Sequence, residues 1–273
     1  MTRTIMAAKN AERISVPPGP IRRWALFLDI DGTLLDIAAT PDAVFVPEAL
    51  PEALRRLQTA FDGAVALISG RALVDIDRLF HAGKIFAAGQ HGAELRLPGR
   101  QVVRARVEEE SLAAMRANVL AAAGKIPGVL VEQKGTGVAV HYRRAPSAGD
   151  NVRRFLDDIM AACEGFEIVP GKMVFEIRPR GVDKGRAIEA FMQHPPFAGR
   201  VPIFVGDDIA DRDGMTAVEK LGGYAVHVGG EAGAGEAEGT EVAGRRFWLP
   251  SPEFVRVWLA GLPGAVAREA ARA

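Results

Sequence analysis

Apolar runs of strand length alternate with amphipathic helical patterns over the first hundred residues. Buried strands are expected at 24–30, 64–68 and 84–88. Between them, residues 47–61 and 72–80 carry apolar side chains at helical spacing. Alternating strands and helices of this kind predict βαβ units and a parallel sheet.

The pattern changes near Gly99. Helices are expected over 108–123 and 151–163. Two pairs of alternating strands accompany them, each joined by a short glycine-containing turn: 129–133 with 138–143, and 167–169 with 173–178. These are hairpin patterns, so this section is predicted to be an antiparallel sheet covered by two helices.

After Pro179 the parallel pattern returns. The expected elements are helices over 184–193, 211–221 and 253–260, and strands over 201–205, 224–228 and 247–249. Residues 229–244, rich in Gly, Ala and Glu, are expected to form a mobile loop. We therefore predict an α/β protein with an inserted second domain. Its parts are a flexible lead at 1–22, a core domain at 23–99 and 179–273, and an insertion at 100–178.

Composition narrows the class of partner. The 34 basic and 34 acidic side chains balance, so no global field attracts nucleic acid or an anionic membrane. No apolar run reaches the ~18 residues of a membrane span, and residues 1–20 lack a signal-peptide pattern. Cys163 cannot form an internal disulfide and is expected to be a core residue rather than a nucleophile. A cytoplasmic protein is predicted.

Two carboxylates follow the first buried strand, in the sequence LDIDGT at 28–33. Asp29 and Asp31 project to the same side if the extended geometry continues. Ligands bind at the carboxyl ends of strands in an open parallel sheet. Two close carboxylates there imply a hard cation such as Mg²⁺, and Thr33 adds a hydroxyl suited to phosphate oxygens. A helix cap followed by an Asp31-Gly32 turn is the alternative interpretation.

Further polar side chains stand at strand or helix ends: Ser69 after the second strand, Lys184 at a helix start, and Asp207, Asp208 and Asp211 after the strand 201–205. Taken singly, Ser69 fits a helix cap, Lys184 a solvated lysine, and Asp207 or Asp208 another cap. Together they bring a hydroxyl, an ammonium and more carboxylates to one sheet edge. That combination indicates a functional site.

This set resembles the four motifs of the haloacid dehalogenase superfamily of phosphohydrolases. The motifs are DIDGT at 29–33, Ser69, Lys184 and GDD at 206–208, and the resemblance extends from Trp24 to the C-terminus. It implies a Rossmann-like core with a parallel sheet. It also implies that residues 100–178 are the mobile cap inserted between the second and third motifs, of the kind called type 2B.

The resemblance also implies a mechanism. Asp29 attacks phosphorus to form an aspartyl phosphate. Asp31 protonates the leaving sugar oxygen and then deprotonates the hydrolytic water. Asp29, Asp207 and the Asp31 carbonyl hold Mg²⁺, which offsets charge between carboxylate and phosphate.

The other motif residues receive supporting roles by the same resemblance. Ser69 and Lys184 hold the transferring oxygens, because phosphoryl transfer needs mainly positioning and charge stabilisation. Asp208 and Asp211 orient Lys184 or metal-bound water. Arg71, two residues after Ser69, joins Thr33 in the expected substrate-binding set.

The predicted cap sheet has two unlike faces. Strand alternation separates Met173, Phe175 and Ile177 from Val174, Glu176 and Arg178. Polar residues of the first hairpin also share parity, namely Glu132 with Lys134 and His141 with Arg143. The polar face is either simply solvated or grips a hydroxyl-rich ligand when the cap closes.

Five stretches resemble the trehalose-6-phosphate phosphatase family: GQHGAE at 89–94, EQK at 132–134, VHYR at 140–143, GKMVFEIRP at 171–179 and GDDIAD at 206–211. The resemblance implies that Glu132, Lys134 and Glu176 bind glucose hydroxyls of the disaccharide. It adds four helpers with less defined roles, His91, Arg143, Lys172 and Arg178. His91 and His141 are equally compatible with structural histidines. Gln90, Ile209-Ala210 and the long loop at 229–244 depart from the family pattern.

The predicted function is Mg²⁺-dependent hydrolysis of trehalose 6-phosphate to trehalose and phosphate. We also expect the protein to associate with a trehalose-6-phosphate synthase. A related phosphatase acting on sucrose phosphate or a monosaccharide phosphate is an alternative. A phosphomutase is less favoured, since it must exclude water from its phospho-aspartate. A non-catalytic sugar-phosphate sensor is disfavoured because Asp29, Asp31, Lys184 and Asp207 are all present.

Overall fold

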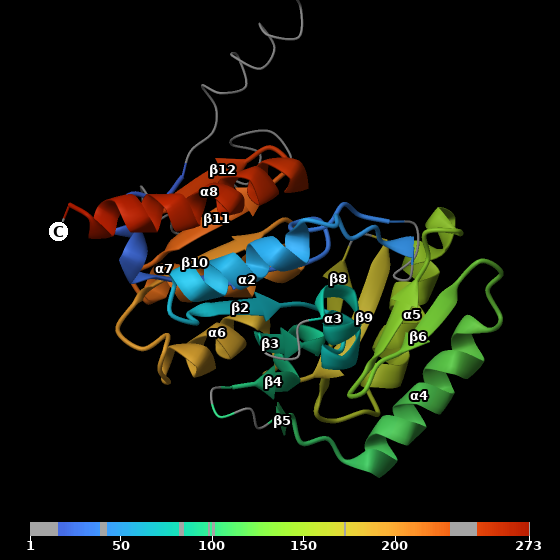
Figure 1. Ribbon diagram of the computed structural model, residues 1–273. Helices are drawn as coiled ribbons and strands as arrows, with labels where there is room; N and C mark the ends of the chain where they lie inside the picture. Colours follow the sequence, from blue (N-terminus) through green and yellow to red (C-terminus); the bar gives the residue numbers. More distant parts are fainter. Residues whose placement is uncertain are drawn as a thin grey trace, which may run out of the picture.

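The computed structural model describes residues 16–38, 43–81, 85–97, 99, 102–171, 173–229 and 245–272. An eight-stranded sheet has the strand order β12-β11-β10-β1-β2-β3-β4-β5 (Figure 1). Its strands are β1 (Trp24–Leu28), β2 (Val65–Ile68), β3 (Phe86–Gly89), β4 (Glu94–Arg96), β5 (Val102–Arg104), β10 (Val201–Gly206), β11 (Tyr224–Val228) and β12 (Arg246–Leu249). β1 is buried throughout and pairs in parallel with both β2 and β10.

This strand order creates a switch point at β1. The chain proceeds from β1 to β2 and β3 on one side, and from β10 to β11 and β12 on the other. Ligands bind where the strand order reverses, outside the carboxyl ends of the strands. The motifs at the ends of β1, β2 and β10 therefore meet at this position.

The helices of this part are α2 (Leu50–Ala60), α3 (Leu73–Phe80), α6 (Lys184–Met192), α7 (Arg212–Lys220) and α8 (Pro252–Ala270), with short 3₁₀ turns η1 (Ile21–Arg23), η3 (Gln90–Gly92) and η5 (Ile209–Asp211). Figure 1 shows α2 and α8 side by side along the sheet, and α6 packs against α7. On α2, the apolar stripe Leu50, Leu54 and Leu57 is buried. Helical spacing thus supplies the apolar face that covers the sheet.

A second, four-stranded antiparallel sheet has the order β6-β7-β9-β8. Its elements are α4 (Glu109–Ala123), β6 (Leu130–Gln133), β7 (Val138–His141), η4 (Pro146–Ala148), α5 (Gly149–Met160), β8 (Phe166–Gly171) and β9 (Val174–Pro179). Val138, Val140 and Ile177 pack in one apolar cluster with residues of α4 and α5. The predicted alternation is confirmed, because the apolar face lies against the two helices.

The predicted α/β class, parallel sheet and antiparallel insertion are confirmed, but two strands were missed. β4 and β5 extend the large sheet in antiparallel fashion. β5 lies beyond residue 100, the predicted start of the cap, and pairs with β4 of the large sheet. The proposed division into core and cap stays a prediction. Helix α8 also extends ten residues past the predicted end at Ala260.

Two segments expected to be flexible or mobile, the N-terminal lead and the loop at 229–244, are largely outside the part of the chain that the structure describes. The residues concerned are 1–15 of the lead and 230–244 of the loop. Among the residues that are described, no helix combines the length and apolarity needed to cross a bilayer.

Candidate active site

The first, second and fourth predicted motifs stand at the ends of neighbouring strands. Asp29 directly follows β1, and its backbone N–H donates to the Val205 carbonyl of β10 at 3.0 Å. Ser69 follows β2 and is 1% exposed, while Asp207 follows β10. The parallel register therefore brings these three side chains to one edge of the sheet, as the sequence predicted.

Lys184 connects two of the predicted carboxylates. The Asp183 side chain caps α6 by accepting from the Arg186 N–H at 2.7 Å, so the helix begins at Lys184. The Lys184 Nζ then donates to Asp29 Oδ1 at 2.6 Å and to Asp211 Oδ1 at 2.5 Å. All three side chains are at least nine-tenths buried. A buried ammonium held by two carboxylates is a rigid arrangement, because each group would be costly to bury alone.

Asp211 holds the turn after β10 together. Its Oδ2 accepts from the backbone N–H groups of Asp207 at 2.9 Å and Asp208 at 3.0 Å. Its Oδ1 meets Lys184, so both carboxylate oxygens are already engaged. The role of Asp211 as an orienting group stays a prediction, which these contacts support.

The carboxylates carry more negative charge than Lys184 balances. Burial, together with Asp211 and Asp207, raises the pKa of Asp29 well above its ordinary value, against the lowering effect of Lys184. Burial, followed by Asp211 and Asp208, raises the pKa of Asp207 to about 7. Although burial acts to lower it, Asp211 and Asp29 raise the pKa of Lys184 above its usual range. The raised pKa values of Asp29 and Asp207 mean that their ionised forms lack compensating positive charge, which a further cation would supply.

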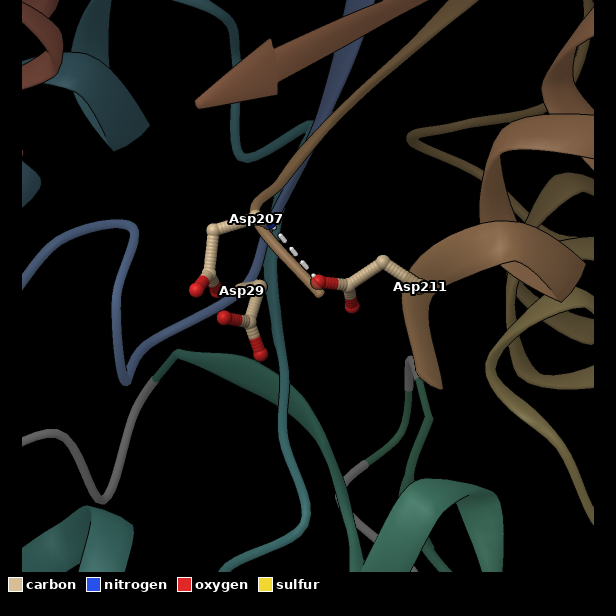
Figure 2. A group of neighbouring side chains, drawn as sticks. All are labelled: Asp29, Asp207 and Asp211. Atoms are coloured by element: carbon tan, nitrogen blue, oxygen red, sulfur yellow. Dashed lines mark hydrogen bonds between the residues drawn. The ribbon is translucent and has the colours of Figure 1, made fainter. Parts of the chain in front are cut away.

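A metal ion fits this need. Figure 2 shows the carboxylates of Asp29 and Asp207 beside each other, with Asp211 approaching from the start of α7. Each of the three offers an oxygen within 4.8 Å of the others. Since both oxygens of Asp211 are engaged, Asp29 and Asp207 are the better ligands. Clustered carboxylate oxygens are what hard divalent cations such as Mg²⁺ and Ca²⁺ prefer.

Gly32 allows the first motif to approach Asp207. It has φ of 86°, and a Cβ there would lie 2.0 Å from Asp207 Oδ2. A side chain is therefore excluded by both backbone conformation and space. Next to it, the buried Thr33 donates its hydroxyl to Asp207 Oδ1 at 3.4 Å. The glycine thus brings the loop after β1 and the turn after β10 into contact.

Asp31 is paired with an arginine of the second motif. Arg71 Nε and Nη2 donate to the two Asp31 oxygens, each at 2.7 Å. The Arg71 backbone N–H donates to Ser69 Oγ at 3.1 Å. Bidentate pairing fixes the orientation of a carboxylate more firmly than a single bond does. Sequence reasoning expected Asp31 and Arg71 at the site, but it did not predict their contact.

The cap reaches this edge through Lys134 and Glu176. Lys134 Nζ donates to the Gly70 carbonyl at 3.2 Å and to Glu176 Oε1 at 2.6 Å. The other oxygen of Glu176 contacts His91 Nε2. Burial acts to raise the pKa of Glu176, yet His91 and Lys134 hold it well below its usual range. Burial lowers the pKa of His91, against the raising effect of the neighbouring Glu176 carboxylate.

Other predicted binding residues lie further from this contact. Glu132 Oε2 pairs with His141 Nε2 at 3.0 Å in a half-exposed position. Arg178 is engaged by Glu167 at 2.9 Å and Asp213 at 3.5 Å. Arg143 is exposed in the turn after β7. Lys172 lies outside the described residues, so its role stays a prediction.

Three residues at the site were not predicted from sequence. Gln90, which departs from the family pattern, is buried and accepts two hydrogen bonds from Thr136 of the cap. Arg116 of α4 donates to the carbonyls of Lys134 and Gly135. Glu94 caps α3 by accepting from the Leu73 N–H at 2.9 Å. Of these, only Glu94 had a signal in the sequence, an acidic residue inside a family-like stretch.

The sequence of this chain is similar to those of known proteins. A profile described as trehalose-phosphatase matches residues 27–241. A probable trehalose-phosphate phosphatase of Sinorhizobium fredii is 41% identical over 257 residues, which is 94% of each chain. The trehalose-6-phosphate phosphatase of Escherichia coli is 38% identical over 218 residues, covering 80% of this chain and 82% of the relative.

A solved structure agrees in fold. The C-terminal domain of the Candida albicans trehalose-6-phosphate phosphatase superposes with a TM-score of 0.75 at 22% identity, covering 89% of this chain and 93% of that one. The predicted α/β fold is therefore confirmed. Because the profile and both relatives extend over most of the sequence, this chain belongs to the trehalose-phosphatase family.

Proposed function

We propose that this protein hydrolyses trehalose 6-phosphate to trehalose and inorganic phosphate with Mg²⁺ bound at the end of β1. The observation that carries the proposal is Lys184 Nζ, which lies between Asp29 at 2.6 Å and Asp211 at 2.5 Å in a chain of this family. The lysine leaves one carboxylate oxygen of Asp29 available for attack on phosphorus. A buried, oriented carboxylate is a suitable nucleophile for phosphoryl transfer.

In the first step, Asp29 attacks phosphorus and the bond from phosphorus to the sugar oxygen breaks. Asp31 gives its proton to that oxygen, which leaves as the trehalose hydroxyl. In the second step, water attacks the aspartyl phosphate, Asp31 takes the proton from that water, and Asp29 is released together with phosphate. Arg71 donates to both oxygens of the ionised Asp31, and one of these two bonds opens when that oxygen carries the proton.

The remaining polar groups stabilise charge. Asp29, Asp207 and the Asp31 carbonyl would hold Mg²⁺, which supplies charge neutralisation between carboxylate and phosphate. Ser69, Thr33 and Lys184 would hold the transferring oxygens, since phosphoryl transfer depends chiefly on positioning and charge. Asp208, whose N–H donates to Asp211, belongs with the orienting groups.

Recognition of the sugar is assigned to the cap. We propose that hydroxyls of the disaccharide bind Glu132, Lys134 and Glu176. The contact of Lys134 with Gly70 supports this assignment, because it brings the cap beside the second motif. Sugar contacts by His91, Arg143, Lys172 and Arg178 stay predictions. Cytoplasmic location and association with a trehalose-6-phosphate synthase also belong to the proposal.

A phosphate-release assay over trehalose 6-phosphate, sucrose 6-phosphate and glucose 6-phosphate, with Mg²⁺ or a chelator, tests the function. We expect kcat/KM for trehalose 6-phosphate to exceed the others by roughly 100-fold, since unpaired polar groups in a site disfavour poorly matched substrates. Release should cease with the chelator. Equal kcat/KM values would favour a general sugar phosphatase. If the protein binds trehalose 6-phosphate without releasing phosphate, and Asp29→Asn binds it equally well, the result would favour a sensor.

A further inference from the structure

The turn between β6 and β7, residues 134–137, touches the core at a residue with no assigned role. Gln90 Oε1 accepts from the Thr136 backbone N–H at 2.9 Å and from its hydroxyl at 3.1 Å. Gln90 is 4% exposed, so this amide oxygen is paired within the protein. The same turn carries Lys134, which reaches the Gly70 carbonyl. One short turn therefore meets the core at two places.

The backbone around Gln90 is tightly held on the core side. Gln90 has φ of 49° and His91 has φ of 58°, a left-handed conformation that costs a non-glycine residue roughly 1 kcal/mol. The Gln90 N–H donates to the Arg71 carbonyl at 2.8 Å, and the His91 N–H to the Ser69 carbonyl at 2.9 Å. The amide of Gln90 is thus presented from a rigid segment tied to the second motif.

Gly135 makes the close approach feasible. A Cβ at this position would lie 2.7 Å from Gln90 Nε2 and 3.3 Å from Gln90 Oε1. Its φ is not in the left-handed region, so alanine here would meet a steric conflict without added backbone strain. The conflict would disappear if the side chain at position 90 were shorter by one methylene.

The cap holds the opposite side of the turn. Arg116 Nη2 donates to the Gly135 carbonyl at 3.0 Å and also meets the Lys134 carbonyl. Within the turn, the Lys134 N–H donates to the Gly137 carbonyl at 3.0 Å. These bonds fix the conformation of the turn without Gln90. The contact with Gln90 therefore determines only the position of the turn relative to the core.

We propose that Gln90 is a positioning residue that docks the 134–137 turn onto the core and thereby sets Lys134 and Glu176 at the sugar site. The inference rests on the proposed function and extends it. It predicts that Gln90 governs affinity for the sugar phosphate rather than the chemical step. A small phosphate ester without sugar hydroxyls makes no contact with these cap residues, so its hydrolysis should not depend on how the turn is docked.

The variant Gln90→Asn tests this proposal, because asparagine tolerates the left-handed conformation but is too short to reach Thr136. Loss of two hydrogen bonds should raise KM for trehalose 6-phosphate roughly tenfold, with kcat little changed. Hydrolysis of p-nitrophenyl phosphate should be unchanged. Thr136→Ser keeps both donors and should behave as the parent protein. Unchanged KM in Gln90→Asn, or an equal loss with p-nitrophenyl phosphate, overturns the proposal.

A double-variant cycle tests the steric part. Gly135→Ala alone should raise KM by about as much as Gln90→Asn, since the new methyl group displaces the turn. Added to Gln90→Asn, it should have little further effect, because the atom it would strike is gone. Independent, multiplying effects would contradict direct contact between these two positions.

Amide hydrogen exchange by NMR supplies a readout that needs no substrate. The Thr136 amide should exchange at least about tenfold faster in Gln90→Asn than in the parent. The Lys134 amide, bonded within the turn, serves as the control and should keep its rate. If the Thr136 rate does not change, the docking proposal fails even if trehalose 6-phosphate is hydrolysed. If the rate changes but that ester is not hydrolysed, the proposed function fails instead.

Discussion

The sheet edge and the polar face of the cap position their charged side chains in different ways. At the edge, the side chains of Lys184, Asp29 and Asp211 are between 1% and 5% exposed, and they are held at strand and helix ends. On the cap, Glu132 and His141 are 41% and 34% exposed, and they pair with each other. Lys134 and Glu176 lie between these extremes, at 15% and 18%.

In the proposed function, this gradient in exposure separates chemistry at the sheet edge from sugar recognition on the cap. Groups that stabilise a transition state work best when they are fixed and shielded before the reaction begins. Groups that recognise a sugar must be accessible when the sugar enters the site. They therefore lie on an element whose contacts with the core can break and form again as the substrate binds.

Replacing the nucleophile should abolish chemistry while sparing the fold. In Asp29→Asn, we expect kcat for phosphate release to fall by on the order of 10⁴-fold or more, as when other enzymes lose a nucleophile. Because the pKa of Asp29 is raised, its ionised form is disfavoured in the fold, and the neutral amide should not lower the thermal midpoint. Substantial turnover by this variant, measured with Mg²⁺ present, would contradict the aspartyl-phosphate mechanism.

The acidic cluster should make metal binding depend on pH. With the pKa of Asp207 at about 7, protons compete with the metal below that pH. The apparent Mg²⁺ affinity should therefore fall by up to about tenfold per pH unit as pH decreases from 7. Titration calorimetry from pH 5.5 to 8 measures this. An affinity independent of pH would show that Asp207 is not a ligand.

The same carboxylate predicts the stability of the metal-free protein. A folded-state pKa of about 7 means that the fold binds more protons than the unfolded chain between the ordinary carboxyl pKa and about 7. Stability from this group is thus present at low pH and is lost as pH rises through about 7. Thermal unfolding in a chelator should show the decline, and Mg²⁺ or Asp207→Asn should reduce it.

On the cap, Glu176→Gln should weaken recognition more than chemistry. The carboxylate bonds to Lys134 and contacts His91, and charged hydrogen bonds contribute about 1.5–3 kcal/mol each. We expect kcat/KM for trehalose 6-phosphate to fall roughly 10- to 100-fold, with p-nitrophenyl phosphate little affected. Equal losses for both substrates would instead indicate a role at phosphorus.

Glu132→Gln should have the smallest effect. Its carboxylate is 41% exposed and is paired with His141, and solvent-screened pairs contribute at most about 1 kcal/mol. A fall in kcat/KM of about five-fold or less is expected. His141→Gln is the matched control, since it removes the other half of the pair. A loss as large as that of Glu176→Gln would show that Glu132 is buried by the bound sugar.

The sequence predicted those helices and strands in which apolar residues recur with a clear period or form a continuous run. The buried strand at β1 and the alternation in β9 were readable because burial on both faces or on one face leaves a distinct apolar pattern. β4 and β5 were missed because each has three residues, too few to show a period. The length of α8 was underestimated because Pro263 lies inside the helix.

The sequence by itself determined the chemical groups: a carboxylate pair after a strand, a hydroxyl, a lysine and an acidic turn. Their meeting follows from parallel strands sharing one carboxyl edge, which the pattern already implies. Tertiary structure alone decided the contacts between Asp31 and Arg71, between Lys134 and Gly70, and between Gln90 and Thr136. These partners are 40 to 64 positions apart, and no local periodicity encodes which side chains meet across such separations when the chain folds.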